Sequence, residues 1–297
     1  MRTVAVMFLA LLAPLSAGAI DVFSCEPEWG ALASELAGDL AELTIATTAF
    51  QDPHRLQAKP SLIAAIRKAD LVVCTGADLE IGWLPLLLRR AGNSAIQAGN
   101  PGHFMAADYV RKLEMPKIID RSQGDIHPQG NPHVHLDPRN MRRIADALAQ
   151  RLAEIDPANA ANYKSRLADF QRRWAASTAE WEERKMGLAG LRVASHHRSF
   201  SYLAAWLDLN IVATLESKPG IPPSGAQLAA LLEQLSPHPP VAVIRTPYEN
   251  EKPSSWLSGR LGIPAIVLPY TIGGDQKVTN LFTLFEESLR ALEVASQ

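Results

Sequence analysis

One segment near the middle of the 297-residue chain constrains its fold more than any other. Residues 158–187 contain no proline, and glycine occurs only at the last position. Apolar side chains recur in this segment at helical spacing: Tyr163, Leu167, Phe170, Trp174 and Trp181. The pattern predicts a helix of about thirty residues, well above the average length. Because one helix alone forms neither a coiled coil nor a bundle, we interpret it as a spine that joins two lobes.

Strand-like and helix-like segments alternate on both sides of this spine. Before it, strands are predicted at 21–24, 43–47 and 70–73, and helices at 28–37, 61–68, 79–90 and 140–155. After it, strands are predicted at 191–194, 211–213, 241–244 and 266–268, and helices at 200–207, 224–235 and 280–292. Such alternation is typical of parallel sheets covered by helices.

The predicted fold class is therefore α/β. We expect two lobes, each a mainly parallel sheet flanked by helices, joined by one long linking helix. The N-terminal lobe is assigned to 20–155, the linking helix to 156–188 and the C-terminal lobe to 189–297. A ligand site is expected between the lobes.

The start of the chain reads as an export signal at residues 1–19. Arg2 supplies the positive charge, 4–15 the apolar run, and 17–19 an Ala-Gly-Ala cleavage site. The apolar run is too short for a comfortable bilayer span, and no cysteine follows the cleavage site. We expect a monomeric protein of the Gram-negative periplasm without a lipid anchor. Its formal net charge of −2 argues against a nucleic-acid partner, which would require a basic face.

The two cysteines, Cys25 and Cys74, each follow a strand-like apolar run. Export would place them in an oxidising compartment, where a disulfide between neighbouring strands is the favoured prediction. Two buried free thiols and a thiolate metal site are the alternatives. The thiolate metal site is disfavoured because no CxxC spacing accompanies the cysteines.

Histidines are concentrated at three places that share one structural setting. The sequence Asn-Pro-His-Val-His-Leu-Asp-Pro at 131–138 holds His133 and His135, and His127 precedes it. His54 and His197 each follow a predicted strand and precede a helix, at the sheet edge where open α/β folds bind ligands. Each histidine alone fits a turn or a solvated surface equally well. Two facing lobes would nevertheless bring His54, His133 and His197 together.

Three imidazoles with one carboxylate suit a borderline-soft ion such as zinc, whereas magnesium or calcium would require more oxygen ligands. The nominated carboxylate is Asp275, in the glycine-containing loop 270–275. Glu216 and Glu249 are the alternatives for the fourth ligand. A water molecule in that position would instead indicate a catalytic site.

The chain resembles the cluster A-I solute-binding proteins of bacterial ABC importers, which bind zinc or manganese. The resemblance covers nearly the whole mature length. It rests on Asp-Pro-His at 52–54, the 131–138 sequence, His-Arg-Ser-Phe-Ser-Tyr at 197–202, Ile-Pro-Pro-Ser at 221–224 and the long helix. It implies a rigid two-lobed receptor with a metal site between the lobes.

By position, the resemblance implies that His54, His133 and His197 are the metal ligands. His135 stands where many members carry an aromatic residue, which suggests an outer-shell or auxiliary metal-capturing imidazole. His196 has no counterpart as a ligand. The 268–275 loop departs from the Asp-Pro-Leu-Gly sequence that is usual in this family, which weakens the assignment of Asp275 as the fourth ligand. The segment 124–130 with His127 resembles a shortened version of the His/Asp-rich insertion that collects ions.

The predicted function is a non-enzymatic periplasmic receptor that captures one Zn²⁺ per chain and delivers it to an inner-membrane ABC permease. A periplasmic metallochaperone is a further candidate partner. The alternatives are a manganese receptor of the same family, a metallochaperone or buffer without a transporter, and a periplasmic zinc hydrolase. A hydrolase would need a general base such as Glu216 or Glu249, and the sequence lacks the His-Glu-x-x-His motif.

Overall fold

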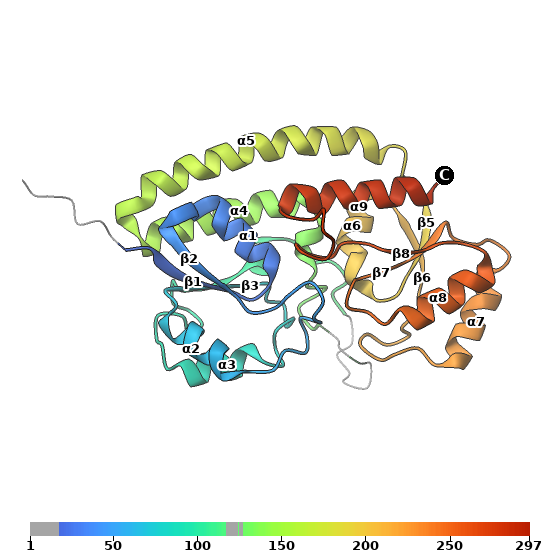
Figure 1. Ribbon diagram of the computed structural model, residues 1–297, viewed down its shortest axis with the longest axis horizontal. Coiled ribbons are helices and arrows are strands. Elements are labelled where there is room, and N and C mark those ends of the chain that lie inside the picture. Colours follow the sequence, from blue (N-terminus) through green and yellow to red (C-terminus); the bar gives the residue numbers. More distant parts are fainter. Residues whose placement is uncertain (1–17, 117–123, 125–126) are drawn as a thin grey trace, which may run out of the picture.

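The structure is a computed structural model that describes residues 18–116, 124 and 127–297. Residues 1–17 of the predicted export signal therefore lie outside the described residues. Two four-stranded parallel sheets form the centre of the molecule, and each is flanked by helices on both faces (Figure 1). This arrangement confirms the predicted fold class. The proposed boundaries at 155/156 and 188/189 stay a prediction.

The first sheet has the strand order β2-β1-β3-β4. Its strands are β1 (Ile20–Ser24), β2 (Ala41–Ile45), β3 (Leu71–Cys74) and β4 (His103–Met105). The helices around it are α1 (Pro27–Ala37), α2 (Pro60–Lys68), α3 (Leu84–Ala91) and α4 (Pro138–Ile155). Successive residues of β3 alternate between two cores, because side chains along a strand point to opposite faces. Leu71 and Val73 pack with α1 and α4, whereas Val72 and Cys74 pack with α2 and α3.

The second sheet repeats the same topology, with the order β6-β5-β7-β8. Its strands are β5 (Arg192–Ser195), β6 (Asn210–Thr214), β7 (Ala242–Arg245) and β8 (Ala265–Val267). Its helices are α6 (Ser201–Leu207), α7 (Gly225–Leu235), α8 (Glu251–Leu261) and α9 (Leu281–Ala295). The carboxyl ends of parallel strands within each sheet meet at one edge, so the loops that follow them lie together.

The predicted spine is present as α5 (Ala160–Lys185), preceded by a 3-10 turn at Pro157–Asn159. In Figure 1 it arches over α4 and α9 and passes from one sheet to the other. Its buried Trp174 and Trp181 both pack against Phe285 of α9, with ring centroids 5.5 and 5.2 Å away. Arg184 at its end pairs with Glu293 of α9 at 2.8 Å. Within the described chain, no helix combines the length and apolar character needed to cross a membrane.

One predicted helix begins later than expected. The segment predicted as a helix at 79–90 forms turns up to Trp83, and α3 begins only at Leu84. Pro85 explains the late start, because a proline is accommodated in the first turn of a helix but not in its interior. Strand β4 and helix α8 were not predicted, since β4 has only three residues and α8 contains Pro253.

The predicted disulfide between Cys25 and Cys74 is confirmed, with a Cα–Cα distance of 4.8 Å. It joins the carboxyl ends of β1 and β3, which are hydrogen-bonded neighbours. Because each sulfur is bonded to the other, the alternative of a thiolate metal site is excluded.

Buried carboxylates lie directly beside this disulfide. Glu80 is 2% exposed and accepts hydrogen bonds from the backbone N–H groups of Thr75 and Gly76, at 2.7 and 3.0 Å. Glu26 accepts from the Thr75 hydroxyl at 3.2 Å. Burial raises the pKa of Glu80 to about 7, and burial together with the nearby Glu80 and Glu28 raises the pKa of Glu26 well above its usual value. Burial of this carboxyl pair is therefore less costly while the pair retains a proton.

Glu80→Gln should change how stability depends on pH. In the unfolded chain the Glu80 carboxyl ionises near pH 4.5, whereas in the folded chain it keeps its proton to about pH 7. The folded state thus binds more protons in this window, and the stability from the proton is lost as pH rises through it. Relative to wild type, the variant should gain about 1 to 3 kcal/mol between pH 5 and pH 8. Urea unfolding of the metal-free proteins measures this, and parallel curves for the two proteins would contradict it.

Candidate metal centre

Three histidines from separate loops meet between the two sheets. His54 lies between β2 and α2, His133 just before α4, and His197 directly after β5. One ring nitrogen from each lies within 4.8 Å of the others. The ring centroids form a nearly equilateral triangle with sides of 5.7, 5.8 and 5.9 Å. We call these residues the histidine triad.

Each ring of the triad is fixed by a hydrogen bond at its Nδ1 atom. His54 bonds to Asp52 Oδ1 at 2.7 Å, His133 to the Tyr270 hydroxyl at 2.8 Å, and His197 to Glu216 Oε2 at 2.8 Å. A carboxylate only accepts, so His54 and His197 donate from Nδ1. This tautomer leaves the Nε2 lone pair for a metal ion, as in most histidine metal sites.

His133 is the most enclosed member of the triad. It is 1% exposed, and its Nε2 atom has no hydrogen-bond partner among the described residues. Burial, followed by the charges of His54 and His197, holds the pKa of His133 well below its usual value. The ring is therefore neutral at neutral pH, which is the state that binds metal.

Asp52 completes the support of the His54 ring. Burial acts to raise its pKa, but the hydrogen bond and the charge of His54 outweigh that effect and lower it. The carboxylate therefore stays ionised and keeps its role as an acceptor.

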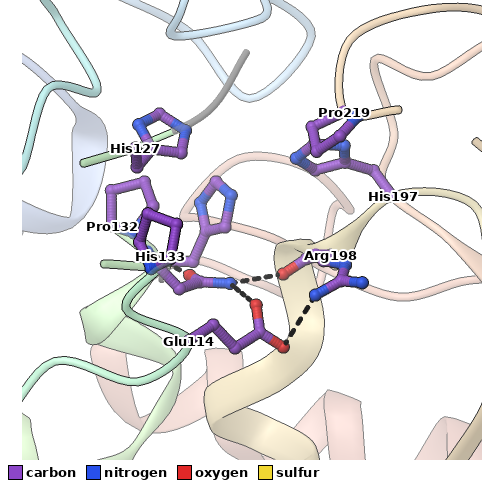
Figure 2. Close-up of a pocket in the computed structure, with 9 residues that line it drawn as sticks. Glu114, His127, Pro132, His133, His197, Arg198 and Pro219 are labelled. Carbon is purple, nitrogen blue, oxygen red and sulfur yellow. Dashed lines mark hydrogen bonds and ion pairs between the residues drawn. The ribbon is translucent and has the colours of Figure 1, made fainter. Parts of the chain in front are cut away.

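The triad borders a cavity of about 130 Å³, which we call the first cavity (Figure 2). His127, His133 and His197 line it, together with Glu114 and Arg198. His127, predicted as an auxiliary collector of ions, is brought directly to the triad: its Nε2 atom lies 3.2 Å from His54 Nε2. Residues 125–126 of the predicted collecting segment 124–130 lie outside the described residues.

Asn131 links the His133 segment to the His197 segment. Its side-chain oxygen accepts from the His133 backbone N–H at 2.9 Å, and its side-chain nitrogen donates to the Arg198 carbonyl at 2.9 Å. The Tyr202 hydroxyl donates to the Asn131 carbonyl at 2.9 Å. These bonds set the relative positions of two triad members that come from different halves of the chain.

His135 is not placed to capture metal from solution. It is fully buried, with Nε2 2.8 Å from the Tyr270 carbonyl oxygen and Nδ1 3.2 Å from Glu28 Oε1. Its ring instead holds the backbone of Tyr270, whose hydroxyl bonds to His133. The part of the prediction that made His135 an outer-shell residue fits this geometry, whereas the capturing role does not.

The three candidate carboxylates lie outside the triad. Asp275 is exposed, and its carboxylate accepts from the Lys277 backbone N–H at 2.8 Å. Glu216 uses Oε2 to accept from His197 Nδ1 and from the Gly220 N–H. Glu249 accepts from the Thr246 N–H at 2.8 Å, and burial raises its pKa to about 8. Among the described residues, no carboxylate has an oxygen within 4.8 Å of all three triad nitrogens.

The sequence interpretation missed three residues that support the triad: Asp52, Tyr270 and Glu216 as an anchor of His197. Asp52 had a local signal, since an acidic residue two positions before a metal-binding histidine is well placed to fix its ring. Tyr270 had none, because it is 137 residues from His133.

Comparison with known families gives this geometry a context. A model of the ZnuA family, described as the periplasmic component A of a zinc-uptake complex, matches residues 22–295. The chain belongs to the ZnuA family. Its members are solute-binding proteins rather than enzymes, which removes the hydrolase alternative.

Relatives within the ZnuA family are named for two different metals. The zinc-binding lipoprotein AdcA of Streptococcus pneumoniae is 22% identical over 271 residues, which cover 87% of this chain and 52% of AdcA. The manganese ABC transporter substrate-binding lipoprotein PsaA of the same species is 22% identical over 245 residues, covering 81% of this chain and 76% of PsaA. This chain thus spans about half the length of AdcA. The two names leave the metal of this protein open.

The fold is also that of ZnuA. A crystal structure of ZnuA superposes with a TM-score of 0.76 at 22% identity, and the match covers 94% of this chain and 98% of that one. ZnuA-family proteins act outside the cytoplasm: the family model describes a periplasmic component, and AdcA and PsaA are lipoproteins.

Tyr270→Phe tests the hydrogen bond that fixes His133. Without the hydroxyl, the His133 ring loses its Nδ1 partner, and the affinity for zinc should fall about 10- to 100-fold. Tyr248→Phe is the matched control, because it removes another tyrosine hydroxyl close to Tyr270 without touching a triad nitrogen. Competition with a fluorescent zinc chelator measures both proteins, and equal affinities would contradict the prediction.

Proposed function

We propose that this protein is the extracytoplasmic receptor of an ABC importer, and that it captures one Zn²⁺ per chain at His54, His133 and His197. The single observation that carries the proposal is the orientation of the triad. Three rings are anchored at Nδ1, and their remaining nitrogens converge. Such a set binds a divalent ion without rearranging the backbone.

The donor set favours zinc over manganese. Imidazole nitrogens suit zinc, whereas manganese prefers carboxylate and carbonyl oxygens. The carboxylates of Asp52 and Glu216 face Nδ1 atoms and hold rings rather than facing the centre. Manganese would therefore meet three nitrogens and gain little from either carboxylate.

We propose His127 as the fourth ligand in place of Asp275. Two nitrogens bound to one tetrahedral zinc at 2.0–2.1 Å are about 3.3 Å apart. The 3.2 Å between His127 Nε2 and His54 Nε2 matches that separation. His127 does not lie within 4.8 Å of all three triad nitrogens, so its ring would have to turn toward the other two histidines when the ion binds. In the metal-free protein these two nitrogens share one hydrogen bond, and the metal ion would replace its proton.

Release requires the loops over the site to separate. Arg55, next to His54, donates to the Gly220 carbonyl at 2.9 Å. Gly124 has a φ of +90°, and a Cβ there would lie 2.3 Å from the Pro219 carbonyl oxygen, so only glycine permits this approach. Three segments thus close over the triad, while α5 keeps the two sheets in place. We infer that handover moves these loops rather than the whole lobes.

The partner that receives the ion is proposed to be an inner-membrane ABC permease. A periplasmic metallochaperone that loads the receptor is a second candidate partner. Both follow from the ZnuA-family membership together with the proposed capture site. We propose that the mature protein is a periplasmic monomer.

Replacing single histidines should produce a graded loss of zinc affinity. Metal-free protein should bind one Zn²⁺ with sub-micromolar affinity. His133→Ala removes the most enclosed donor and should weaken binding about 100-fold or more, a loss of about 2.7 kcal/mol. His127→Ala should cost about tenfold, because water can take its place.

His103→Ala is the control for this series. His103 lies in β4, where its Nδ1 bonds to the Ile96 carbonyl, and it does not line the triad. The zinc affinity of the His103→Ala variant, measured by isothermal titration calorimetry, should equal that of wild type. Equal losses in His103→Ala and His133→Ala would refute the assignment of the ligands.

Metal choice is tested by direct competition. Zinc-loaded protein dialysed against a hundredfold excess of Mn²⁺ should retain its zinc, because the triad lacks oxygen donors. Elemental analysis after dialysis measures both metals. Replacement of zinc by manganese at the triad would show that the protein is a manganese receptor.

A further inference from the structure

A second cavity also adjoins the histidine triad. It has a volume of about 220 Å³, and it reaches His54 and His197 from the side of the second sheet. His196, Glu216 and Glu249 line it. The inference below rests on the proposed function, because it concerns an ion beside the triad.

These three residues lie in the loops that follow three neighbouring strands at one sheet edge. His196 follows β5, Glu216 follows β6 and Glu249 follows β7. In the sheet, β5 lies between β6 and β7, so the three loops are neighbours. Backbone hydrogen bonds fix them: the His196 N–H donates to the Ile244 carbonyl, and the Glu216 N–H donates to the His196 carbonyl. The carboxyl edge of an open parallel sheet is where such folds bind ligands.

Each of the three side chains has a potential metal-binding atom that is not engaged by the protein. His196 is 4% exposed, and its Nδ1 atom has no hydrogen-bond partner among the described residues. Its Nε2 atom lies 3.9 Å from Glu216 Oε1, beyond hydrogen-bond distance. Glu249 is held through Oε2 by the Thr246 N–H, and its buried Oε1 is without a partner among the described residues.

Buried polar atoms of this kind destabilise the folded protein unless a ligand binds them. A buried polar atom without a partner loses its hydration and gains nothing in exchange. Glu249 also carries the repulsion of Glu216, which adds to burial in raising its pKa to about 8. A cation between the two carboxylates would remove both penalties.

We propose that His196, Glu216 and Glu249 form a second divalent-cation site, from which the ion passes to the triad. One nitrogen and two carboxylate oxygens make a harder donor set than the triad, so the site discriminates less between zinc and manganese. Glu216 connects the two sites, because its other oxygen accepts from His197 Nδ1. His196 has no ligand counterpart in the family resemblance.

The second site closes around its ion by side-chain rotation. Among the described residues, only the triad and the group Cys25, Cys74 and Glu80 bring three potential ligand atoms within 4.8 Å. The donor atoms of the second site are therefore farther apart than those of the triad. Binding there should accordingly be weaker, as a transfer position requires.

The test fills the triad first and then probes the second site. Protein holding one equivalent of Zn²⁺ is titrated with Mn²⁺, and free Mn²⁺ is followed by electron paramagnetic resonance. Wild type should bind one Mn²⁺ while its zinc content stays constant. His196→Ala and the nearly isosteric Glu249→Gln should each weaken Mn²⁺ binding by about tenfold or more.

Two controls separate this site from other sources of binding. His238→Ala removes an exposed histidine just after α7, and His103→Ala removes the histidine of β4, which lines neither site; both should bind Mn²⁺ as wild type does. Circular dichroism checks the fold of each variant. Absence of Mn²⁺ binding to zinc-loaded wild type, unchanged binding in both site variants, or loss of binding in His103→Ala would overturn the second site. Failure of wild type to hold the first Zn²⁺ would instead overturn the proposed function.

Discussion

The metal centre depends on three hydrogen bonds that leave each triad ring only one useful orientation. Asp52, Tyr270 and Glu216 hold the Nδ1 atoms, so the Nε2 atoms face one another. Neutral imidazoles tolerate this proximity, whereas three imidazolium ions would repel. The burial that keeps the His133 ring neutral therefore also permits the cluster to exist without a metal. Side-chain packing thus preorganises the site. An ion that binds there needs only to exchange its water ligands for imidazole nitrogens.

The rest of the fold fixes the positions of Asp52, Tyr270 and Glu216 relative to one another, although they come from the two halves of the chain. Tyr270 belongs to the second half of the chain, yet its carbonyl bonds to His135 and its hydroxyl to His133 in the first half. Thr271, the next residue, donates to Glu28 of α1 at 2.5 Å. Relative movement of the lobes would break this set of bonds together with the anchor of His133. The long helix α5 and its aromatic contacts with α9 oppose such movement, which places the flexibility needed for release in the loops.

The sequence predicted the parts of the site that follow from local pattern. His54 and His197 each follow a strand, and the carboxyl ends of parallel strands converge, so their meeting was predictable. Tyr270 was not, because nothing local distinguishes a phenol that reaches a ring 137 residues away. Asp275 was nominated from its loop, but the same loop turns Tyr270 inward and leaves Asp275 in solvent. In the fold, the helix predicted at 79–90 was wrong only in its start, because Pro85 places Leu84 in the first turn.

The two cavities beside the triad give an ion different surroundings on its two sides. His127 makes the first cavity rich in nitrogen, whereas Glu216 and Glu249 make the second rich in oxygen. A hydrated ion loses its water to carboxylate oxygens at low cost, because they replace oxygen with oxygen. Imidazoles then select zinc from what has arrived. In this order, the carboxylates of the second site would set how fast an ion is captured, and the imidazoles of the triad would set which metal is retained.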